Sequence, residues 1–358
     1  MKIAFLMSSK HLVPPLKTGG IEEATYYLSR ELAKKGHQIT IFAAPGSKIS
    51  CVKFKKNSPF FVLSKIKRGF LEERISGFFD NSFLGDFFIS RKDEKFDLIQ
   101  YNGYLFYQIL PFAKFSKRPI IIEINYPHKE IYKYLKKEIR KIKNVFYLPV
   151  SDFIKTMMPD LPYLPVFTQA LDFNCFPLFS KTKKEYLFFL GRICPEKGTH
   201  LAIKVAQKAR KKLIIAGRID DSHLSYYYSF VKPHLNRYIR YVGEVDFKTK
   251  INLYGKAIAT LFPIQWDEPS GLTIMESMAC GVPPIIFDRA AAREMVEDNL
   301  SGFVVPDGDV DAMARKTDEV NKLNRWRIRR WAENKFSVEK KVIDYEKICQ
   351  SILNRNIL

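Results

Sequence analysis

Two carboxylates lie eight positions apart at a predicted strand-to-helix junction. They are Glu268 and Glu276, in the stretch WDEPSGLTIME that begins at Trp266. Residues 257–263 are an apolar run typical of a buried strand, and residues 271–279 have helical spacing. Glu268 is therefore expected in the loop after the strand, with Glu276 about two turns into the helix. Carboxylates at such positions can accept hydrogen bonds from ligand hydroxyl groups.

An anion seat is expected between the two carboxylates. The backbone N–H groups of Ser270, Gly271 and Leu272 open the predicted helix, and a helix N-terminus attracts phosphate. A ligand with hydroxyls at both ends and phosphates in the middle, such as a nucleotide sugar, fits this order of groups. The alternative is an ordinary surface loop followed by a solvated carboxylate.

A second loop supplies cations. Arg192 and Lys197 lie between an apolar strand at 186–190 and a predicted helix at 199–210. Gly191 and Gly198 in the same loop would permit close backbone approach. Loss of a nucleoside diphosphate from a sugar builds negative charge on the leaving phosphate, which fixed cations can neutralise without a metal. Solvated side chains are the alternative for any single Arg or Lys here.

These stretches resemble motifs of the family 4 retaining glycosyltransferases. Glu268 to Glu276 resembles their E-x7-E motif, and Phe189 to Gly198 resembles their diphosphate-binding loop. The N-terminal glycine loop and first helix are matched by residues 18–21 and 28–37, and further matches lie at 279–286 and 301–305. The resemblance is strong from 186 to 306, clear over the first 45 residues and weak between them.

The resemblance implies an α/β protein with the GT-B fold, in which two Rossmann-like doubly wound domains face a central cleft. We expect an N-terminal domain at 1–172, completed by a C-terminal helical segment at 338–358, and a nucleotide-sugar domain at 173–337. The alternation of apolar strands and predicted helices along both halves is typical of this class.

The resemblance also implies roles for residues. Glu276 would take the ribose hydroxyls and Glu268 the donor-sugar hydroxyls, while Gly19 and Gly20 would face them from the N-terminal domain. Val242 and Gly243 are expected to border the base, and Arg218 is a weaker diphosphate candidate. The candidate catalytic residues are Arg192, Lys197, Glu268 and Asn125, and the candidate donor-binding residues are Gly19, Gly20, Gly191, Arg192, Lys197, Gly217, Val242, Gly243, Glu268, Ser270, Gly271, Leu272 and Glu276.

The sequence departs from the family in several places. Asn125 stands after the strand at 119–124, where members usually carry a His that reaches the donor sugar. An amide can hydrogen-bond a hydroxyl but cannot transfer a proton; His128 is a nearby substitute, with a surface histidine as the alternative. Ala290 and Ala291 replace a usual Gly-Gly pair. These changes bear on catalytic rate and donor identity more than on the fold.

The expected activity is retaining, metal-independent transfer of a hexose from a nucleotide sugar, UDP-glucose or a close relative, to an unidentified acceptor. No metal or other cofactor is expected, because Asp307-Gly-Asp309, although it spells a metal-binding DxD, lies where a turn and helix N-cap are expected. Within enzymes, a glycogen or starch synthase or a sugar phosphorylase is the rival. A catalytically impaired homologue that binds a nucleotide sugar or a partner is the rival from another class.

The net charge of +21 has three interpretations. A basic amphipathic helix is predicted at 129–143, and Lys residues alternate with Phe and Ile at 53–79. The charge could be a solvated face, a contact with an anionic membrane surface, or a nucleic-acid interface. No nucleic-acid-binding motif supports the last of these.

Composition favours a cytoplasmic protein, with peripheral membrane contact left open. The five cysteines form no CxxC pair, which is typical of a reducing compartment. The first seven residues are too short for a signal-peptide core and resemble a strand. No apolar run approaches the roughly 20 residues needed to span a bilayer.

Overall fold

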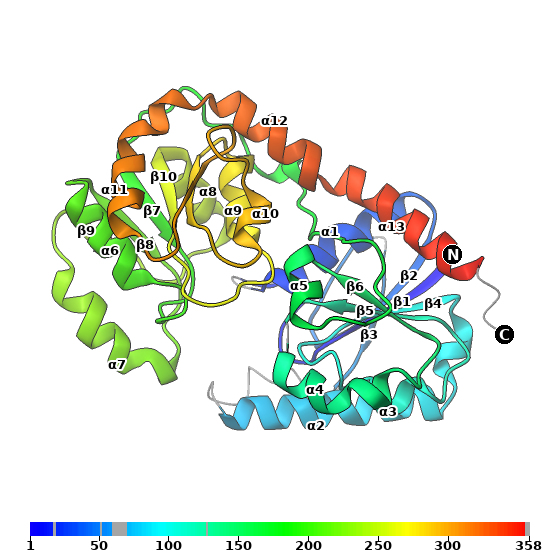
Figure 1. Cartoon of the computed structure of the whole chain (residues 1–358). Coiled ribbons are helices and arrows are strands. Elements are labelled where there is room, and N and C mark those ends of the chain that lie inside the picture. Colours follow the sequence, from blue (N-terminus) through cyan, green and yellow to red (C-terminus); the bar gives the residue numbers. More distant parts are fainter. Residues whose placement is uncertain (17–18, 51, 59–69, 127, 355–358) are drawn as a thin grey trace. The chain divides into compact units, whose positions relative to one another are not determined.

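A computed structural model describes residues 1–16, 19–50, 52–58, 70–126 and 128–354 (Figure 1). The chain divides into two units, one made of residues 1–170 together with the segment from 338 onward, and the other of residues 171–337. Each unit contains one six-stranded sheet in which every strand pair is parallel. Parallel sheets need both faces covered, and helices supply that cover in each unit.

The N-terminal sheet has the strand order β3-β2-β1-β4-β5-β6, so its order reverses at β1. The central strands are buried and mostly apolar, which is why they are recognisable in the sequence. The strand bounds are β1 Lys2–Met7, β2 Gln38–Ala43, β3 Lys53–Lys56, β4 Leu98–Asn102, β5 Ile120–Ile124 and β6 Val145–Pro149.

Helices cover this sheet on both faces. On one face α1 and α13 pack over a core that includes Phe5, Leu32 and Tyr345. On the other, α2 contributes Leu84, Phe87 and other rings to a second core. The helix bounds are α1 Gly20–Lys34, α2 Phe70–Ile89, α3 Leu110–Ala113, α4 Lys129–Ile139, α5 Asp152–Met157 and α13 Val338–Leu353. The last helix of the chain thus belongs to the N-terminal unit.

The C-terminal sheet has the order β12-β11-β10-β7-β8-β9. Its strands are β7 Tyr186–Leu190, β8 Leu213–Ala216, β9 Ile239–Tyr241, β10 Ala257–Phe262, β11 Pro284–Phe287 and β12 Phe303–Val305. Its helices are α6 Thr199–Lys208, α7 Leu224–Tyr226, α8 Phe247–Lys256, α9 Leu272–Ala279, α10 Ala292–Met295, α11 Val310–Glu319 and α12 Arg325–Phe336. Helix α11 ends at Glu319, and a 3-10 turn at Val320–Lys322 follows it.

The elements that were not predicted from the sequence include one strand and two helices of more than ten residues. Strand β3 reads KFKK and lies at the sheet edge, where charged residues are common and no apolar run marks the strand. Helix α12 reads RWRIRRWAENKF, with few apolar positions. Helix α2 is rich in phenylalanine without a strong polar face. Of the helices in the described ranges, none combines the length and apolar character needed to cross a bilayer.

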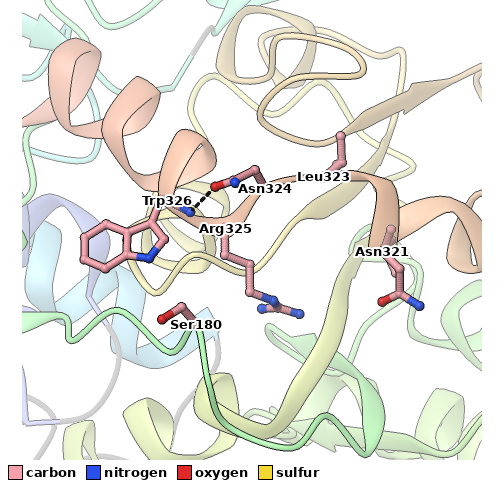
Figure 2. A pocket seen from close by; sticks show the side chains of 7 residues that line it. Ser180, Asn321, Leu323, Asn324, Arg325 and Trp326 are labelled. Carbon is pink, nitrogen blue, oxygen red and sulfur yellow. Dashed lines mark hydrogen bonds between the residues drawn. The ribbon is translucent and has the colours of Figure 1, made fainter.

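A pocket of about 300 Å³ lies on the C-terminal unit where α12 begins (Figure 2). Its Arg325 guanidinium donates to the carbonyl oxygens of Gly281, Ala257 and Ile258 at 3.0–3.3 Å. Ala257 and Ile258 are the first two residues of β10. The pocket therefore lies at the amino-terminal ends of the sheet's strands, opposite their carboxyl ends. The lining residues are Ser180, Val320, Asn321, Leu323, Asn324, Arg325 and Trp326.

A polar network is buried between the N-terminal sheet and its helices. Tyr345 donates to Gln100 Oε1 at 2.9 Å, and Gln100 Nε2 donates to Asn102 Oδ1 at 2.7 Å and to Glu123 Oε2 at 3.3 Å. Asn102 in turn donates to Thr25 Oγ1 at 2.8 Å. Burial raises the pKa of Glu123 to about 7. The network therefore contains a carboxyl that changes charge near neutral pH.

Replacing Glu123 with Gln should stabilise the protein in a pH-dependent way. The folded chain retains a proton on Glu123 between about pH 4.5 and 7 that the unfolded chain has lost, so the carboxyl's contribution to stability falls as pH rises through this window. The neutral amide has no such loss. Glu123→Gln should gain up to about 3 kcal/mol over wild type above pH 7, and almost nothing near pH 4.5.

Thermal unfolding of both proteins at pH 5 and pH 8 measures this difference. Glu138→Gln, a substitution at an exposed site on α4, is the matched control and should show no such trend. A difference in Tm between Glu123→Gln and wild type that is the same at both pH values would contradict the assignment.

Candidate functional site

The predicted donor residues of the C-terminal unit gather at the carboxyl ends of its strands. In the strand order, β7 is flanked by β10 on one side and by β8 on the other. The chain leaves β7 and β10 in opposite directions, and a crevice forms at such a switch point in a parallel sheet. The loop after β7 carries Arg192 and Lys197, and the loop after β10 carries Glu268. These two loops supply the centre of the candidate site.

Lys197 and Glu268 are in direct contact. The Lys197 ammonium forms an ion pair with Glu268 Oε2, and Trp266 Nε1 donates to the same oxygen at 2.8 Å. The ammonium also lies 5.3 Å from the centroid of the Trp266 ring, a cation–π arrangement. Both charged side chains remain partly exposed, at 18% and 16%. A cation predicted for phosphate and a carboxylate predicted for sugar therefore meet in one place.

Two glycines allow the loops to approach this closely. A Cβ atom on Gly198 would lie 1.9 Å from the carbonyl oxygen of Pro263, and one on Gly217 would lie 1.7 Å from that of Gly191. Both residues also have φ values in the region that favours glycine, +70° and +145°. The loop after β7 is thus in backbone contact with those after β10 and β8.

Arg192 and Arg218 flank one carboxylate. Arg192 Nη1 lies 3.6 Å from Asp220 Oδ2, and Arg218 Nε lies 2.9 Å from Asp220 Oδ1. Arg192 is the more exposed of the two, at 40% of its side chain against 17%. The loops after β7 and β8 therefore place two guanidinium groups on the same edge, oriented by a shared aspartate.

The start of α9 has the expected form. Gly271 is the N-cap, and its carbonyl accepts from the N–H groups of Ile274 and Met275 at 2.9 and 3.1 Å. As a glycine, this N-cap residue contributes no side-chain hydrogen bond to the helix. The first-turn N–H groups, beginning with Leu272, have no intrahelical partner, while Ser270 before the cap is buried. This N-terminus lies within the loop that follows β10.

Glu276 lies deeper than the sequence indicated. Only 2% of its side chain is exposed, and both carboxylate oxygens contact helix α8. Lys250 Nζ lies 2.5 Å from Oε1, and the Tyr254 hydroxyl donates to Oε2 at 3.0 Å. Lys250, Tyr254 and Trp266 were not predicted from the sequence as site residues. The four-residue spacing of Lys250 and Tyr254 could have placed them on one helix face, although it could not have named their partner.

The residues expected near the base follow β8 and β9. Gly217 donates to the Gly243 carbonyl at 2.9 Å, and the Tyr241 hydroxyl donates to the Gly217 carbonyl at 2.8 Å. Val242 is 38% exposed. These contacts fix the backbone of both strand ends and leave the Val242 side chain at the surface.

The remaining predicted residues belong to the N-terminal unit. Gly19 is the N-cap of α1 and Gly20 is its first residue, while Thr18 of the predicted glycine loop is outside the described residues. Asn125 Oδ1 accepts from Gln169 Nε2 at 3.0 Å. His128 is half-buried beside the rings of Tyr126 and Tyr107, and burial lowers the pKa of its imidazole.

Asp309 caps a helix, which confirms that interpretation of the DxD sequence. Its Oδ1 accepts from the N–H of Ala312 at 2.8 Å at the start of α11, and Asp307 pairs with Arg289 at 2.7 Å. Within the described ranges, no group of three or more His, Cys, Asp or Glu side chains is arranged to hold a metal ion.

Comparison with known families identifies the C-terminal unit. A family model described as "Glycosyl transferases group 1" matches residues 172–337. This region is a group 1 glycosyltransferase domain. The match confirms the family resemblance given by the E-x7-E and diphosphate-loop motifs. The group 1 domain coincides closely with the C-terminal unit at 171–337.

Curated relatives carry glycosyltransferase names. Phosphatidyl-myo-inositol mannosyltransferase of Mycolicibacterium smegmatis is 31% identical over 134 residues, covering 36% of this chain and 34% of the relative. Glycogen synthase of Mycobacterium tuberculosis is 27% identical over 165 residues, covering 44% and 39%. The chain therefore spans between about a third and a half of the length of the curated relatives it matches.

Solved structures extend the likeness to the whole fold. Sucrose-phosphate synthase from Thermosynechococcus elongatus has a TM-score of 0.78 at 16% identity, covering 99% of this chain and 100% of that one. Anabaena HepE in complex with UDP and glucose has a TM-score of 0.73 at 16% identity, covering 98% and 100%. The fold on both sides of the group 1 domain boundary is GT-B, as the sequence predicted.

Proposed function

We propose that this protein is a glycosyltransferase that takes a hexose from a nucleotide sugar bound at the carboxyl edge of the C-terminal sheet. The observation that carries the proposal is the meeting of Lys197, Glu268 and the α9 N-terminus at the switch point between β7 and β10. Cationic, carboxylate and anion-binding groups there match the parts of a nucleotide sugar in order. The group 1 family match and the names of the relatives support the same activity.

The diphosphate is assigned to the cations and the α9 N-terminus. Free N–H groups at a helix start bind anions, and Arg192 can present two donors to phosphate oxygens. A diphosphate beside Lys197 would compete with Glu268 for its ammonium. Glu268 would then be available to accept hydrogen bonds from the sugar hydroxyls. The Lys197–Glu268 ion pair thus keeps the proposed diphosphate-binding cation and the proposed sugar-binding carboxylate next to each other.

The chemistry assigned to the site is metal-independent and retaining. Arg192 and Lys197 would stabilise the charge that develops on the leaving diphosphate. No protein nucleophile is assigned, and Asn125 can orient a hydroxyl but cannot move a proton. The acceptor, assigned to the N-terminal unit, would attack from the face that the leaving group departs. A UDP-hexose such as UDP-glucose is the proposed donor, and solved neighbours include complexes with UDP and UDP-glucose.

A catalytically impaired homologue remains the rival function. Asn125 favours it, because an amide replaces the proton-transferring side chain that the family usually carries there. Slow release of UDP from UDP-glucose distinguishes the two functions without knowledge of the acceptor. Nucleotide binding with no release of UDP under any condition would favour the binding protein.

An anionic membrane surface is a proposed second partner. The basic helix α4 turns Tyr132, Leu135 and Ile139 into the core, so its apolar face is not available to lipid. Its outer face exposes cations together with Tyr134, which is 86% exposed. One relative is named for a phosphatidylinositol acceptor. Residues 59–69 of the other basic segment lie outside the described residues.

The two site glutamates should act on different parts of the donor. Glu276→Gln should weaken UDP and UDP-glucose binding alike, because both contain the ribose. Glu268→Gln should weaken only the additional binding due to glucose, and should leave UDP affinity unchanged or higher because Lys197 is released. Each lost hydrogen bond to a charged group costs about 1.5–3 kcal/mol.

Calorimetric titration of each variant with UDP and UDP-glucose measures these effects. Glu297→Gln, at an exposed position of the same unit, is the control and should bind both ligands as wild type does. Equal losses for both ligands in both site variants would overturn the assignment of roles.

Arg192→Ala should lower the rate of UDP release from UDP-glucose by roughly 10²–10³, the scale for one lost preorganised donor. EDTA should leave the wild-type rate unchanged, because fixed cations supply the positive charge. Arg240→Ala, which removes an exposed cation from β9, serves as the control and should retain the wild-type rate. A strict requirement for Mg²⁺ or Mn²⁺ would refute metal independence.

Membrane contact predicts salt-sensitive binding to vesicles that contain phosphatidylserine, and weak binding to phosphatidylcholine alone. Changing Lys129, Lys133 and Lys137 to Glu should reduce sedimentation with anionic vesicles at least 10-fold, since each cation near an anionic leaflet contributes about 1 kcal/mol. The matched triple change at Lys181, Lys183 and Lys248 should have less effect. Protein that stays in the supernatant at low salt would rule the membrane out.

A further inference from the structure

Helix α8 holds the carboxylate of Glu276 from one side. Lys250 and Tyr254, one helical turn apart, each contact a different oxygen, at 2.5 and 3.0 Å. The Tyr254 hydroxyl also lies 3.3 Å from the Thr273 carbonyl, one turn before Glu276 on α9. The contact between α8 and α9 is therefore polar at Glu276, the residue that the proposed function assigns to the ribose.

Because the carboxylate of Glu276 is buried, it needs a cation beside it, and Lys250 supplies that cation. Glu276 is 2% exposed and Lys250 is 11% exposed. Burying a carboxylate is costly unless a positive charge lies beside it. Arg329 of α12 directs its guanidinium to the carbonyls of Phe173, Phe176 and Ala279. Among the described residues, Lys250 is the cation in ion-pair contact with Glu276.

The other titratable groups around Glu276 do not replace Lys250. They are the Tyr254 hydroxyl on α8, the Cys280 thiol that follows α9, Arg329 on α12 and Lys184 before β7. Burial, together with the negative charge of Glu276, raises the pKa of Cys280 to about 12. Lys184 donates to the carbonyls of Phe179 and Gly255 at 2.8 Å. Neither residue balances the charge of Glu276 by direct contact.

Lys250 is itself positioned by the start of α8. Asp246 caps the helix by accepting from the N–H of Thr249 at 2.8 Å. The Lys250 ammonium lies 5.0 Å from the Phe247 ring centroid and 5.9 Å from that of Phe176. Those two rings pack edge to face, 5.4 Å apart. The aromatic pair limits where the ammonium can go and directs it to Glu276.

We propose that Lys250 is a positioning residue that orients Glu276 as an acceptor for the two ribose hydroxyls of the donor. This inference rests on the proposed function. A carboxylate offers about four acceptor sites, two on each oxygen. Lys250 and Tyr254 occupy one on each oxygen, so one remains on each for the 2′- and 3′-hydroxyls. Without Lys250 the carboxylate could turn away from the ribose and would lose this match.

The alternative role for the same contact is that Lys250 blocks Glu276. If Lys250 blocked Glu276 instead of preparing it, its removal would free the carboxylate and nucleotide would bind more tightly. The two roles therefore predict opposite changes in affinity.

The experiment compares UDP with 2′,3′-dideoxy-UDP by calorimetry. Wild type should prefer UDP by roughly 10-fold or more, the scale of hydrogen bonds to a charged group. Lys250→Met should lose most of this preference, because Glu276 is no longer held with an acceptor site on each oxygen toward the ribose. Lys248→Met, the same substitution at an exposed position of α8, should behave as wild type.

Three outcomes would overturn the inference while leaving the proposed function intact. Tighter UDP binding by Lys250→Met would show that Lys250 blocks Glu276, and an unchanged preference for UDP would show that Lys250 has no role. A loss of affinity that is equal for both nucleotides would indicate only structural damage and would also refute the inference. Failure of wild type to bind any of UDP, GDP and ADP would instead refute the proposed function.

A thermal unfolding cycle tests the ion pair without any ligand. Lys250→Met alone leaves a buried unpaired carboxylate and should lower Tm. Adding Glu276→Gln to that variant should restore part of the loss, whereas Glu276→Gln should not raise the Tm of Lys248→Met. Additive effects of the two substitutions at 250 and 276 would show that the pair is not coupled, and the inference would fail.

Discussion

The candidate site depends on how helix α9 is fixed at its C-terminal end and at its middle. Its C-terminal end is held from α12, where Arg329 donates to the Ala279 carbonyl at 2.6 Å and Arg325 to the Gly281 carbonyl at 3.1 Å. Cations at a helix C-terminus satisfy carbonyls that lack partners and complement the helix dipole. Its middle is held from α8 by Lys250. Its N-terminus begins after Gly271, which has no side chain to cap it. An eight-residue helix anchored in this way keeps its N–H groups in a defined place, which an anion seat requires.

The two lysine–glutamate pairs of the C-terminal unit differ in a way that suits their assigned roles. Lys197 and Glu268 are each about one-sixth exposed, so water can replace either partner and the pair costs little to open. Lys250 and Glu276 are nearly enclosed, and separating them would leave a buried charge at a cost of several kcal/mol. The first pair can therefore exchange partners with a ligand, whereas the second is part of the framework. Two lysine–glutamate pairs thus have different roles because one is partly exposed and the other is buried.

Most of the fold, but only part of the candidate site, could be predicted from local sequence patterns. Apolar strand runs, and glycines such as Gly198 whose space is limited by a neighbouring carbonyl, are visible as pattern. Strand β3 and helix α12 are not, because edge position and carbonyl contacts stabilise them more than an apolar periodicity does. The partner of Glu276 could not be predicted, since Lys250 is 26 positions away and nothing in its local spacing marks it as buried. Ion pairs between elements depend on sheet order, which the sequence expresses only indirectly.

The departures from the family pattern acquire a physical meaning in the same way. Ala290 replaces a usual glycine and adopts φ of +49°, a conformation that is unfavourable for a residue with a Cβ atom. The next residue, Ala291, donates its N–H to the Glu268 carbonyl at 3.2 Å. Strain at Ala290 is therefore linked to the loop that holds Glu268 against Lys197. Backbone strain persists only where surrounding contacts outweigh it, and here those contacts are the ones that define the candidate site. The alanine thus adopts a backbone conformation that favours glycine, and the surrounding packing compensates for the strain.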